Sequence, residues 1–167
     1  MATKTLVSID EYLKTGFPDL DCEYVDGEIV ERSVPVFSHG EVQLSLGSLF
    51  RSLRKQFPLH ATAETRLRVS ADRVRIPDVS VFSPGKPSDS DLSTPPFIVI
   101  EILSPDDRML NVLEKLSEYR NMGIPHIWAV DPLSHHLYEY SKSLNQVASF
   151  CLSEFGIEIT PAQIFAD

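Results

Sequence analysis

The sequence predicts a single α/β domain over residues 1–167, with a β-hairpin near its N-terminus. Two observations carry this prediction. Residues 97–103 form an almost unbroken apolar run, which is typical of a central strand covered on both faces. Before and after that run, apolar residues recur with the 3.6-residue period of an amphipathic helix. The length and the 43% hydrophobic content suit one globular domain with a core of its own.

The N-terminal segment is expected to form a short helix and then the hairpin. Ser8 and Glu11 have the spacing of a capping box, which predicts that a helix begins there. Residues 23–30 are then predicted to be two strands joined at Asp26 and Gly27, a residue pair that favours tight hairpin turns.

A long helix is predicted next. Ser38 and Glu41 repeat the capping-box spacing, and the helical pattern continues until Pro58 ends it. The apolar residues that follow the helical period are Val42, Leu46, Leu49, Phe50, Leu53 and Phe57.

The rest of the chain is expected to alternate between strands and one further helix. The predicted elements are strands over 60–82 around a turn near 71–72, a loop over 84–96, the buried strand over 97–103, a turn at 104–107, a helix from Met109 to Gly123, a strand over 126–131, and strands over 137–140 and 147–150 that continue the sheet as a meander.

The net charge of −9 argues against a nucleic-acid partner, because phosphate binding draws on clustered Lys and Arg side chains. Basic residues do gather in two places, within residues 51–55 and within residues 66–75. Each group is compatible with a local positive surface and equally with the solvated face of a helix or a hairpin. The sequence leaves both interpretations open.

The chain is expected to be cytoplasmic and to have no membrane partner. No stretch approaches the run of about 20 apolar residues that a membrane span needs, and the N-terminus lacks a basic segment followed by an apolar one. Cys22 and Cys151 belong to different segments and neither forms a CxxC pair. A disulfide framework or a structural zinc site is therefore not expected.

Two acidic residues stand in predicted strands, where an ionised carboxylate is costly. Glu101 interrupts the apolar run 97–103, and burying its charge costs several kcal/mol unless a cation or hydrogen-bond donors meet it. Asp78 opens another strand directly after Pro77. If the two strands are neighbours, the paired acids suit Mg²⁺ or Mn²⁺, which prefer oxygen ligands. A structural salt bridge is the alternative that the residues leave open.

Lys115 lies on the helix that follows the Glu101 strand, at the border of the apolar stripe of that helix. An ammonium group beside a metal would stabilise the charge that develops on phosphate during phosphoryl transfer. A lysine that lays its stem along the core edge and ends in solvent is the alternative interpretation.

Several segments, taken in order, carry a resemblance to a known family. They are Glu23-Tyr-Val-Asp-Gly-Glu28, Arg75-Ile-Pro77-Asp78-Val, Ile100-Glu101-Ile-Leu-Ser104-Pro105 and Glu114-Lys115-Leu-x-x-Tyr119-x-x-x-Gly123-Ile-Pro125-x-x-Trp128-x-Val-Asp131-Pro132. In this order they resemble the Uma-type restriction-endonuclease family of the PD-(D/E)XK nuclease superfamily. The resemblance covers nearly the whole chain.

The resemblance implies a restriction-endonuclease-like fold, in which a central mixed β-sheet is flanked by α-helices. It implies that Asp78 and Glu101 bind Mg²⁺ or Mn²⁺, with Ile102 as a further residue of the metal site and Glu23 as an accessory acid. The protein is then expected to be an endonuclease that hydrolyses phosphodiester bonds of DNA. A homodimer is expected by analogy with nucleases that address two strands.

The sequence departs from the superfamily pattern at one position. The superfamily lysine stands two residues after the second acid, where this chain has Leu103. By the resemblance, Lys115 on the next helix supplies that lysine. The family often has an acid four residues before this lysine, where this chain has Asn111. A non-catalytic domain that binds nucleic acid or a protein partner is therefore the alternative function.

Two further residues are interpreted mainly as structural. His39, near the start of the long helix, is expected to make local hydrogen bonds, although it could face the site. Trp128 has apolar strand neighbours and is expected to lie in the core.

Overall fold

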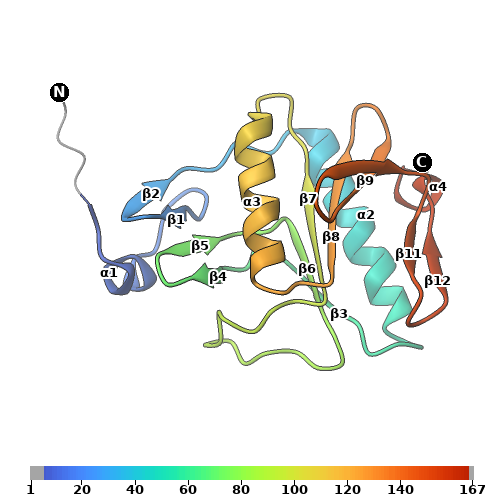
Figure 1. Cartoon of the computed structure of the whole chain (residues 1–167), viewed down its shortest axis with the longest axis horizontal. Helices are drawn as coiled ribbons and strands as arrows, with labels where there is room; N and C mark the ends of the chain where they lie inside the picture. Colours follow the sequence, from blue (N-terminus) through green and yellow to red (C-terminus); the bar gives the residue numbers. More distant parts are fainter. Residues whose placement is uncertain (1–5, 166–167) are drawn as a thin grey trace.

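The protein is built around a mixed six-stranded sheet, as a computed structural model of residues 6–165 describes (Figure 1). The expectation that the N-terminus lacks a basic segment followed by an apolar one concerns residues 1–5 in part, and these lie outside the described residues. The helices are α1 (Ile9–Lys14), α2 (Phe37–Leu53), α3 (Met109–Asn121) and α4 (Pro161–Phe165). The strands are β1 (Glu23–Val25), β2 (Glu28–Val30), β3 (His60–Ala63), β4 (Leu67–Ser70), β5 (Arg73–Arg75), β6 (Val79–Phe82), β7 (Ile98–Ile102), β8 (His126–Asp131), β9 (His136–Tyr140), β10 (Leu144–Val147), β11 (Phe150–Leu152) and β12 (Ile157–Ile159).

The six strands follow the order β10-β9-β8-β7-β6-β3. Only β7 and β8 run parallel within this order, and α3 makes the crossover between them. Parallel neighbours need such a crossover because a tight turn can join only antiparallel strands. Gly123, with a φ of 88°, lets the chain leave α3 and enter β8. The predicted mixed sheet with flanking helices is confirmed.

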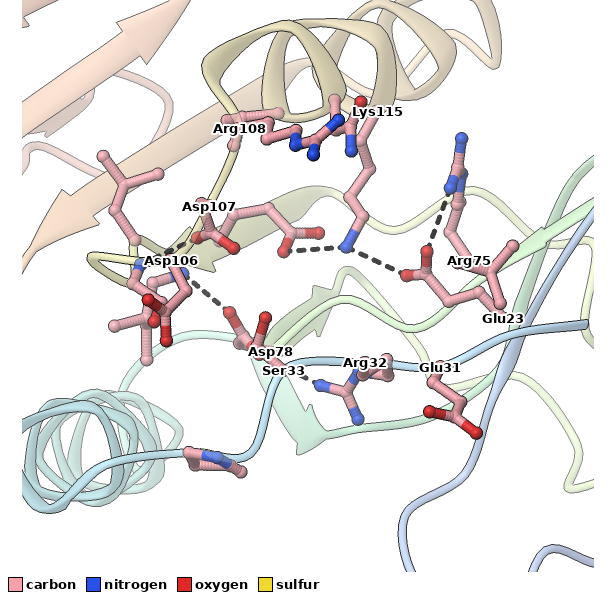
Figure 2. A pocket seen from close by; sticks show the side chains of 18 of the residues that line it. Glu23, Glu31, Arg32, Ser33, Arg75, Asp78, Asp106, Asp107, Arg108 and Lys115 are labelled. Atoms are coloured by element: carbon pink, nitrogen blue, oxygen red, sulfur yellow. Dashed lines mark hydrogen bonds and ion pairs between the residues drawn. The ribbon is translucent and has the colours of Figure 1, made fainter.

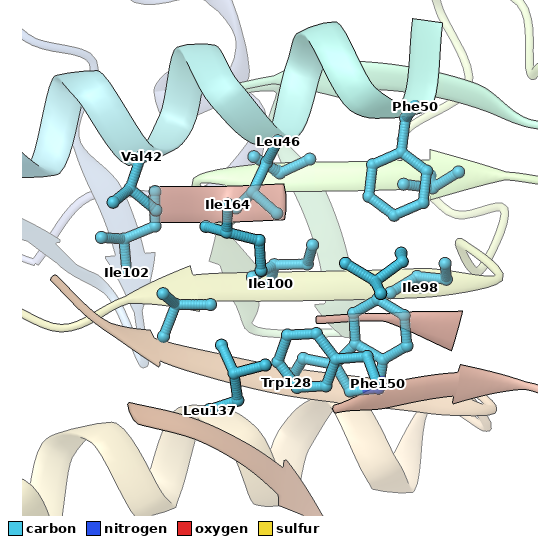
Figure 3. Packing of buried hydrophobic residues seen from close by; sticks show 14 of the residues in the cluster. Val42, Leu46, Phe50, Ile98, Ile100, Ile102, Trp128, Leu137, Phe150 and Ile164 are labelled. Atoms are coloured by element: carbon cyan, nitrogen blue, oxygen red, sulfur yellow. The ribbon is translucent and has the colours of Figure 1, made fainter. Parts of the chain in front are cut away.

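Strand β7 is apolar throughout, except for one residue, because helices cover both of its faces. Ile98, Ile100 and Ile102 belong to the cluster that packs against α2 (Figure 3). Val99 instead packs with residues of α3, among them Tyr119. Because side chains alternate along a strand, Glu101 points to the α3 side with Val99. Strand β7 therefore presents its one acidic residue to α3.

A second sheet lies beside the first and has the order β2-β1-β5-β4. Its β1–β2 hairpin turns at Asp26 and Gly27, whose φ angles are 51° and 91°. Two consecutive positive φ values are what the predicted tight hairpin turn requires. The Ser8 hydroxyl accepts a hydrogen bond from the Glu11 N–H, which is the N-cap half of the predicted capping box of α1. The predicted N-terminal hairpin is confirmed.

The predicted start of the long helix is wrong. Helix α2 begins at Phe37 after Val36, without a side-chain cap, so Ser38 and Glu41 lie inside the helix. The helix ends at Leu53, before Pro58. Ser38 cannot act as the N-cap, because an N-cap residue has an extended backbone and the helix has already begun at Phe37.

The predicted meander is confirmed for β9 and β10, but the predicted bounds 147–150 of its last strand are wrong. Val147 ends β10, and Phe150 begins β11, which pairs with β12 in a separate two-stranded sheet. The Phe150 ring stacks on Trp128, with centroids 4.1 Å apart, and both side chains are buried (Figure 3). Phe150 lies outside the meander because it packs over the core on Trp128. The local sequence pattern gives no sign of this tertiary contact. Trp128 is in the core as expected.

The structure also describes the helices and the two cysteines that bear on membrane spans and disulfides. None of the helices within residues 6–165 is both long enough and apolar enough to cross a bilayer. Cys22 is buried and Cys151 is exposed, and both are free thiols.

Candidate active site

A cleft of about 410 Å³ opens between the β2–α2 connection, the C-terminal end of β7 and helix α3 (Figure 2). Its walls include acids and cations from segments that are far apart in the sequence. The charged residues that line it are Glu23, Glu31, Arg32, Arg75, Asp78, Glu101, Asp106, Asp107, Arg108, Glu114 and Lys115.

Asp78 enters the cleft from the residue before β6. Strand β6 pairs antiparallel with β7 so that Val79 lies opposite Ile100, and this register, continued by one residue, places Asp78 opposite Glu101. Asp78 is 4% exposed, and its Oδ2 accepts a 2.7 Å hydrogen bond from the Ile102 N–H. The condition that the sequence left open is therefore met: β6 and β7 are neighbours, and Asp78 directly precedes β6.

The ionised form of Asp78 is favoured despite burial. Burial alone would raise the pKa of this carboxyl, but contacts with His39 and with the Ile102 N–H outweigh that effect and hold the pKa below its usual value. Asp78 is therefore a carboxylate at neutral pH.

Glu101 is in the opposite electrostatic situation. Its Oε1 accepts a 2.5 Å hydrogen bond from the Tyr119 hydroxyl, and its Oε2 lies 3.3 Å from Lys115 Nζ. Burial raises the pKa of Glu101 to about 7, and the negative charges of Asp78 and Glu23 act in the same direction against the attraction of Lys115. In Glu101, therefore, the positive charge nearby is not sufficient to keep the pKa at its usual value.

Lys115 lies between two acids. From α3 it reaches toward the sheet, and its Nζ is 2.9 Å from Glu23 Oε1 as well as 3.3 Å from Glu101 Oε2 (Figure 2). Burial would lower the pKa of Lys115, but Glu101 and Glu23 outweigh burial and raise it. Lys115 is therefore a fixed ammonium group and not a solvated surface lysine. Asn111, one helical turn earlier, lines the same cleft and offers no carboxylate to it.

Glu23, predicted as an accessory acid, holds the hairpin sheet against this cluster. Its Oε2 accepts a 2.9 Å hydrogen bond from Arg75 Nη1, and its Oε1 accepts one of 3.0 Å from the Ile76 N–H. Arg75 in turn donates to Glu118 of α3. Burial opposes the ionisation of Glu23, but Lys115 and Arg75 outweigh it and lower its pKa.

The basic group within residues 66–75 is largely neutralised by carboxylates. Arg66 pairs with Asp21, and Arg73 pairs with Asp26, Glu114 and Glu118. With Arg75 also paired, these arginines link the second sheet to α3 and to the segment around Asp21, and they do not form a free positive surface. By contrast, Arg51, Arg54 and Lys55 make no ion pair with another described residue.

His39 faces the site, so the expectation of only local hydrogen bonds is wrong. Its ring is buried, and Nε2 lies 3.3 Å from Asp78 Oδ1, although the orientation is not that of a hydrogen bond. Burial lowers the pKa of His39, but the contact with Asp78 outweighs this and raises it. The early start of α2 at Phe37 places this residue in the first helical turn, above Asp78.

Sequence reasoning missed Arg32. Its side chain is 12% exposed and its Nη2 lies 3.1 Å from Asp78 Oδ1. Arg32 stands in an irregular connection without periodicity or a motif, so no local signal in the sequence singles it out.

The donor atoms of this cleft suit a hard divalent cation. Within residues 6–165 no three His, Cys, Asp or Glu side chains converge as a metal site. The side-chain donors would be Asp78 and Glu101, and the predicted third residue, Ile102, could contribute only its main-chain carbonyl because its side chain packs in the core. Such a sparse set of oxygen donors fits Mg²⁺ or Mn²⁺, which keep several waters. The raised pKa of Glu101 agrees with a buried carboxyl whose charge Lys115 does not fully offset.

Comparisons with known proteins identify a family and agree with the fold. The family model Uma2, described as "Putative restriction endonuclease", matches residues 9–165. A crystal structure of a "putative nuclease belonging to DUF820" from Anabaena variabilis ATCC 29413 is similar, with a TM-score of 0.82 and 24% sequence identity. The match covers 96% of this chain and 98% of that chain, and at this identity it shows the fold alone. No curated protein matches the chain.

Proposed function

Because the chain belongs to the Uma2 family, described as putative restriction endonucleases, we propose that it hydrolyses phosphodiester bonds of DNA with the help of Mg²⁺ or Mn²⁺. The observation that carries this proposal is the meeting of Asp78 and Glu101, from adjacent antiparallel strands, in one cleft beside the ammonium group of Lys115.

In this proposal Asp78, Glu101 and the carbonyl of Ile102 hold the divalent cation. When bound, such a cation lowers the pKa of a coordinated water and stabilises negative charge on the phosphate. Asp78 is suited to this role because it is already ionised, whereas Glu101 must release its proton before it can serve as a ligand.

Lys115 orients and stabilises rather than acting as a base. Its carboxylate neighbours Glu101 and Glu23 keep it protonated, so it cannot take a proton from the attacking water. It can donate hydrogen bonds to that water or to a phosphate oxygen, where negative charge develops in the transition state. Glu23 fixes the position of Nζ through the 2.9 Å contact, and Arg75 fixes Glu23.

The cleft contains cations that a phosphate would contact, although carboxylates outnumber them in its lining. The net charge is −9, but Arg32, Arg108 and Lys115 line the cleft. Arg108 is exposed at the start of α3 and has no ion pair with another described residue. The proposal therefore assigns substrate binding to a local group of cations and not to a general positive surface.

A non-catalytic domain on the same scaffold is the second candidate. It is favoured by the closure of the ionic cluster on itself, because the oxygens of Asp78, Glu23 and Glu101 all have protein partners. Such a domain would use the cluster to hold β1, the sheet and α3 together. It predicts that divalent cations leave the melting temperature unchanged.

Calorimetric titration of Mn²⁺ into the metal-free protein tests the proposal. The wild type is expected to bind Mn²⁺, whereas Asp78→Ala and Glu101→Ala are expected to lose binding and DNA cleavage while they stay folded. Asp106→Ala is the matched control, because Asp106 is an exposed acid of the same cleft without an ion pair among the described residues. Variants of the two acids that cleave DNA as fast as the wild type would refute the proposal.

A further inference from the structure

We propose that Arg32 is a displaceable counter-cation: it neutralises Asp78 while the site holds no metal, and it binds the phosphate of the substrate once a divalent cation occupies Asp78. The inference rests on the proposed metal-dependent hydrolysis and adds to it a residue that recognises the nucleic-acid backbone.

Arg32 and Lys115 approach the acids from opposite sides of the cleft. Arg32 belongs to the connection between β2 and α2, whereas Lys115 extends from α3 (Figure 2). The two cations also differ in how they are held. Lys115 lies between two buried carboxylates, Glu23 and Glu101, and so has no freedom to move toward a ligand.

The guanidinium of Arg32 contacts the Asp78 oxygen that a metal would need. Asp78 Oδ2 already accepts the Ile102 N–H at 2.7 Å, so a cation would bind at Oδ1, which His39 Nε2 also approaches to 3.3 Å. Arg32 Nη2 lies 3.1 Å from that Oδ1. A divalent ion on the same oxygen would stand close to the guanidinium, and the two positive charges would repel each other. Metal binding and the Arg32–Asp78 contact therefore compete.

The second contact of Arg32 is weak enough to release it. Nη1 lies 3.6 Å from Glu64 Oε2, and the Glu64 side chain is 33% exposed, so water screens this pair. The connection that carries Arg32 consists mostly of exposed residues. Once displaced from Asp78, the planar fork of Arg32 is free to donate paired hydrogen bonds to phosphate oxygens, a geometry that a lysine cannot offer.

Metal affinity measured in Arg32→Gln gives the first test, because glutamine removes the competing charge. We expect Mn²⁺ to bind about 10-fold more tightly to Arg32→Gln than to the wild type in calorimetric titration, which corresponds to the loss of about one moderate ion pair. Arg108→Gln is the matched control, since it removes the same charge from the same cleft without a contact to Asp78. Its Mn²⁺ affinity should change by less than about 2-fold.

Substrate binding gives the second test and moves in the opposite direction. A fluorescein-labelled DNA duplex in Ca²⁺, observed by anisotropy, should bind Arg32→Gln about 10-fold or more weakly than wild type, because a charge-assisted paired contact to phosphate is lost. A purely structural arginine would not produce tighter metal binding together with weaker DNA binding. Arg32→Lys retains the charge and should return Mn²⁺ affinity to within about 3-fold of wild type, which also controls for folding.

The outcomes separate this inference from the proposed function. Unchanged or weaker Mn²⁺ binding by Arg32→Gln, beside Asp78-dependent binding in the wild type, overturns the role of Arg32 and leaves the proposed function standing. Binding to Arg32→Gln alone supports the competition. No Mn²⁺ binding to either protein overturns both.

Discussion

Replacing Lys115 by methionine would reveal how much the buried acids depend on this one cation. Lys115 Nζ contacts Glu23 Oε1 at 2.9 Å and Glu101 Oε2 at 3.3 Å, and the two acids are 4% and 7% exposed. Methionine keeps most of the packing of the lysine stem but removes the charge. The change therefore isolates the electrostatic contribution of the ammonium group.

The expected loss follows from what remains around each acid. Leaving one member of a buried ion pair without its partner costs about 3–5 kcal/mol. Glu23 keeps Arg75 as a second partner, and Glu101 can take up a proton because burial already raises its pKa to about 7. We therefore expect the lower end, about 3 kcal/mol in the free energy of unfolding. For a chain of this length that lowers Tm by about 6–12 °C.

Urea denaturation at about pH 8, where Glu101 is ionised in the metal-free wild type, measures this loss. The double variant Lys115→Met with Glu101→Gln should recover at least about 1 kcal/mol, because the buried charge is then absent as well. Lys86→Met, at an exposed lysine, should stay within about 0.5 kcal/mol of wild type. A Lys115→Met protein as stable as the Lys86→Met control would refute the reasoning, as would a double variant without recovery.

Three other predictions concern the site and the scaffold. Relative to Glu101→Gln, the metal-free wild type should lose stability as the pH rises from about 4.5 to about 7, because the folded state holds the Glu101 proton more tightly than the unfolded state does. Over the same pH range, Mn²⁺ should raise the Tm of the wild type by an increasing amount. Differential scanning fluorimetry across pH would measure both effects. Trp128→Ala should cost about 3–5 kcal/mol in urea denaturation, since the ring is 1% exposed and stacks on Phe150, and a loss under about 1 kcal/mol would contradict this packing. Gly123→Ala should destabilise the protein by about 1 kcal/mol because the φ of Gly123 is 88°. Gly47→Ala should instead stabilise it by about 0.5–1 kcal/mol, because Gly47 lies inside α2 with open space around it. Thermal melts that shift in the same direction for both variants would refute this difference in backbone conformation.

The local pattern of the chain was sufficient to predict most elements and to single out Asp78 and Glu101, whereas only the structure shows that their strands are neighbours. The apolar run 97–103 predicted a strand covered on both faces, and β7 is such a strand between α2 and α3. Glu101 was identifiable because a charge in that run is costly, and Asp78 because it opens a strand after a proline. These inferences succeeded because periodicity and burial cost are properties of a few consecutive residues.

The charge environment of the site could be decided only by the tertiary structure. Arg32 and His39 both contact Asp78, which is 46 and 39 residues away in the sequence, and neither belongs to a pattern that links it to that acid. In the same way, the sequence could not show that the arginines within 66–75 are paired, or that Phe150 leaves the meander to stack on Trp128.

The residue identities thus determined which segments become strands and helices and which acids they bury. The tertiary structure decided which cation meets which acid: Lys115 between Glu23 and Glu101, and Arg32 on Asp78. The physical reason is that hydrophobic periodicity acts over a few residues, whereas an ion pair depends on distances of a few ångströms between side chains that only the folded chain brings together.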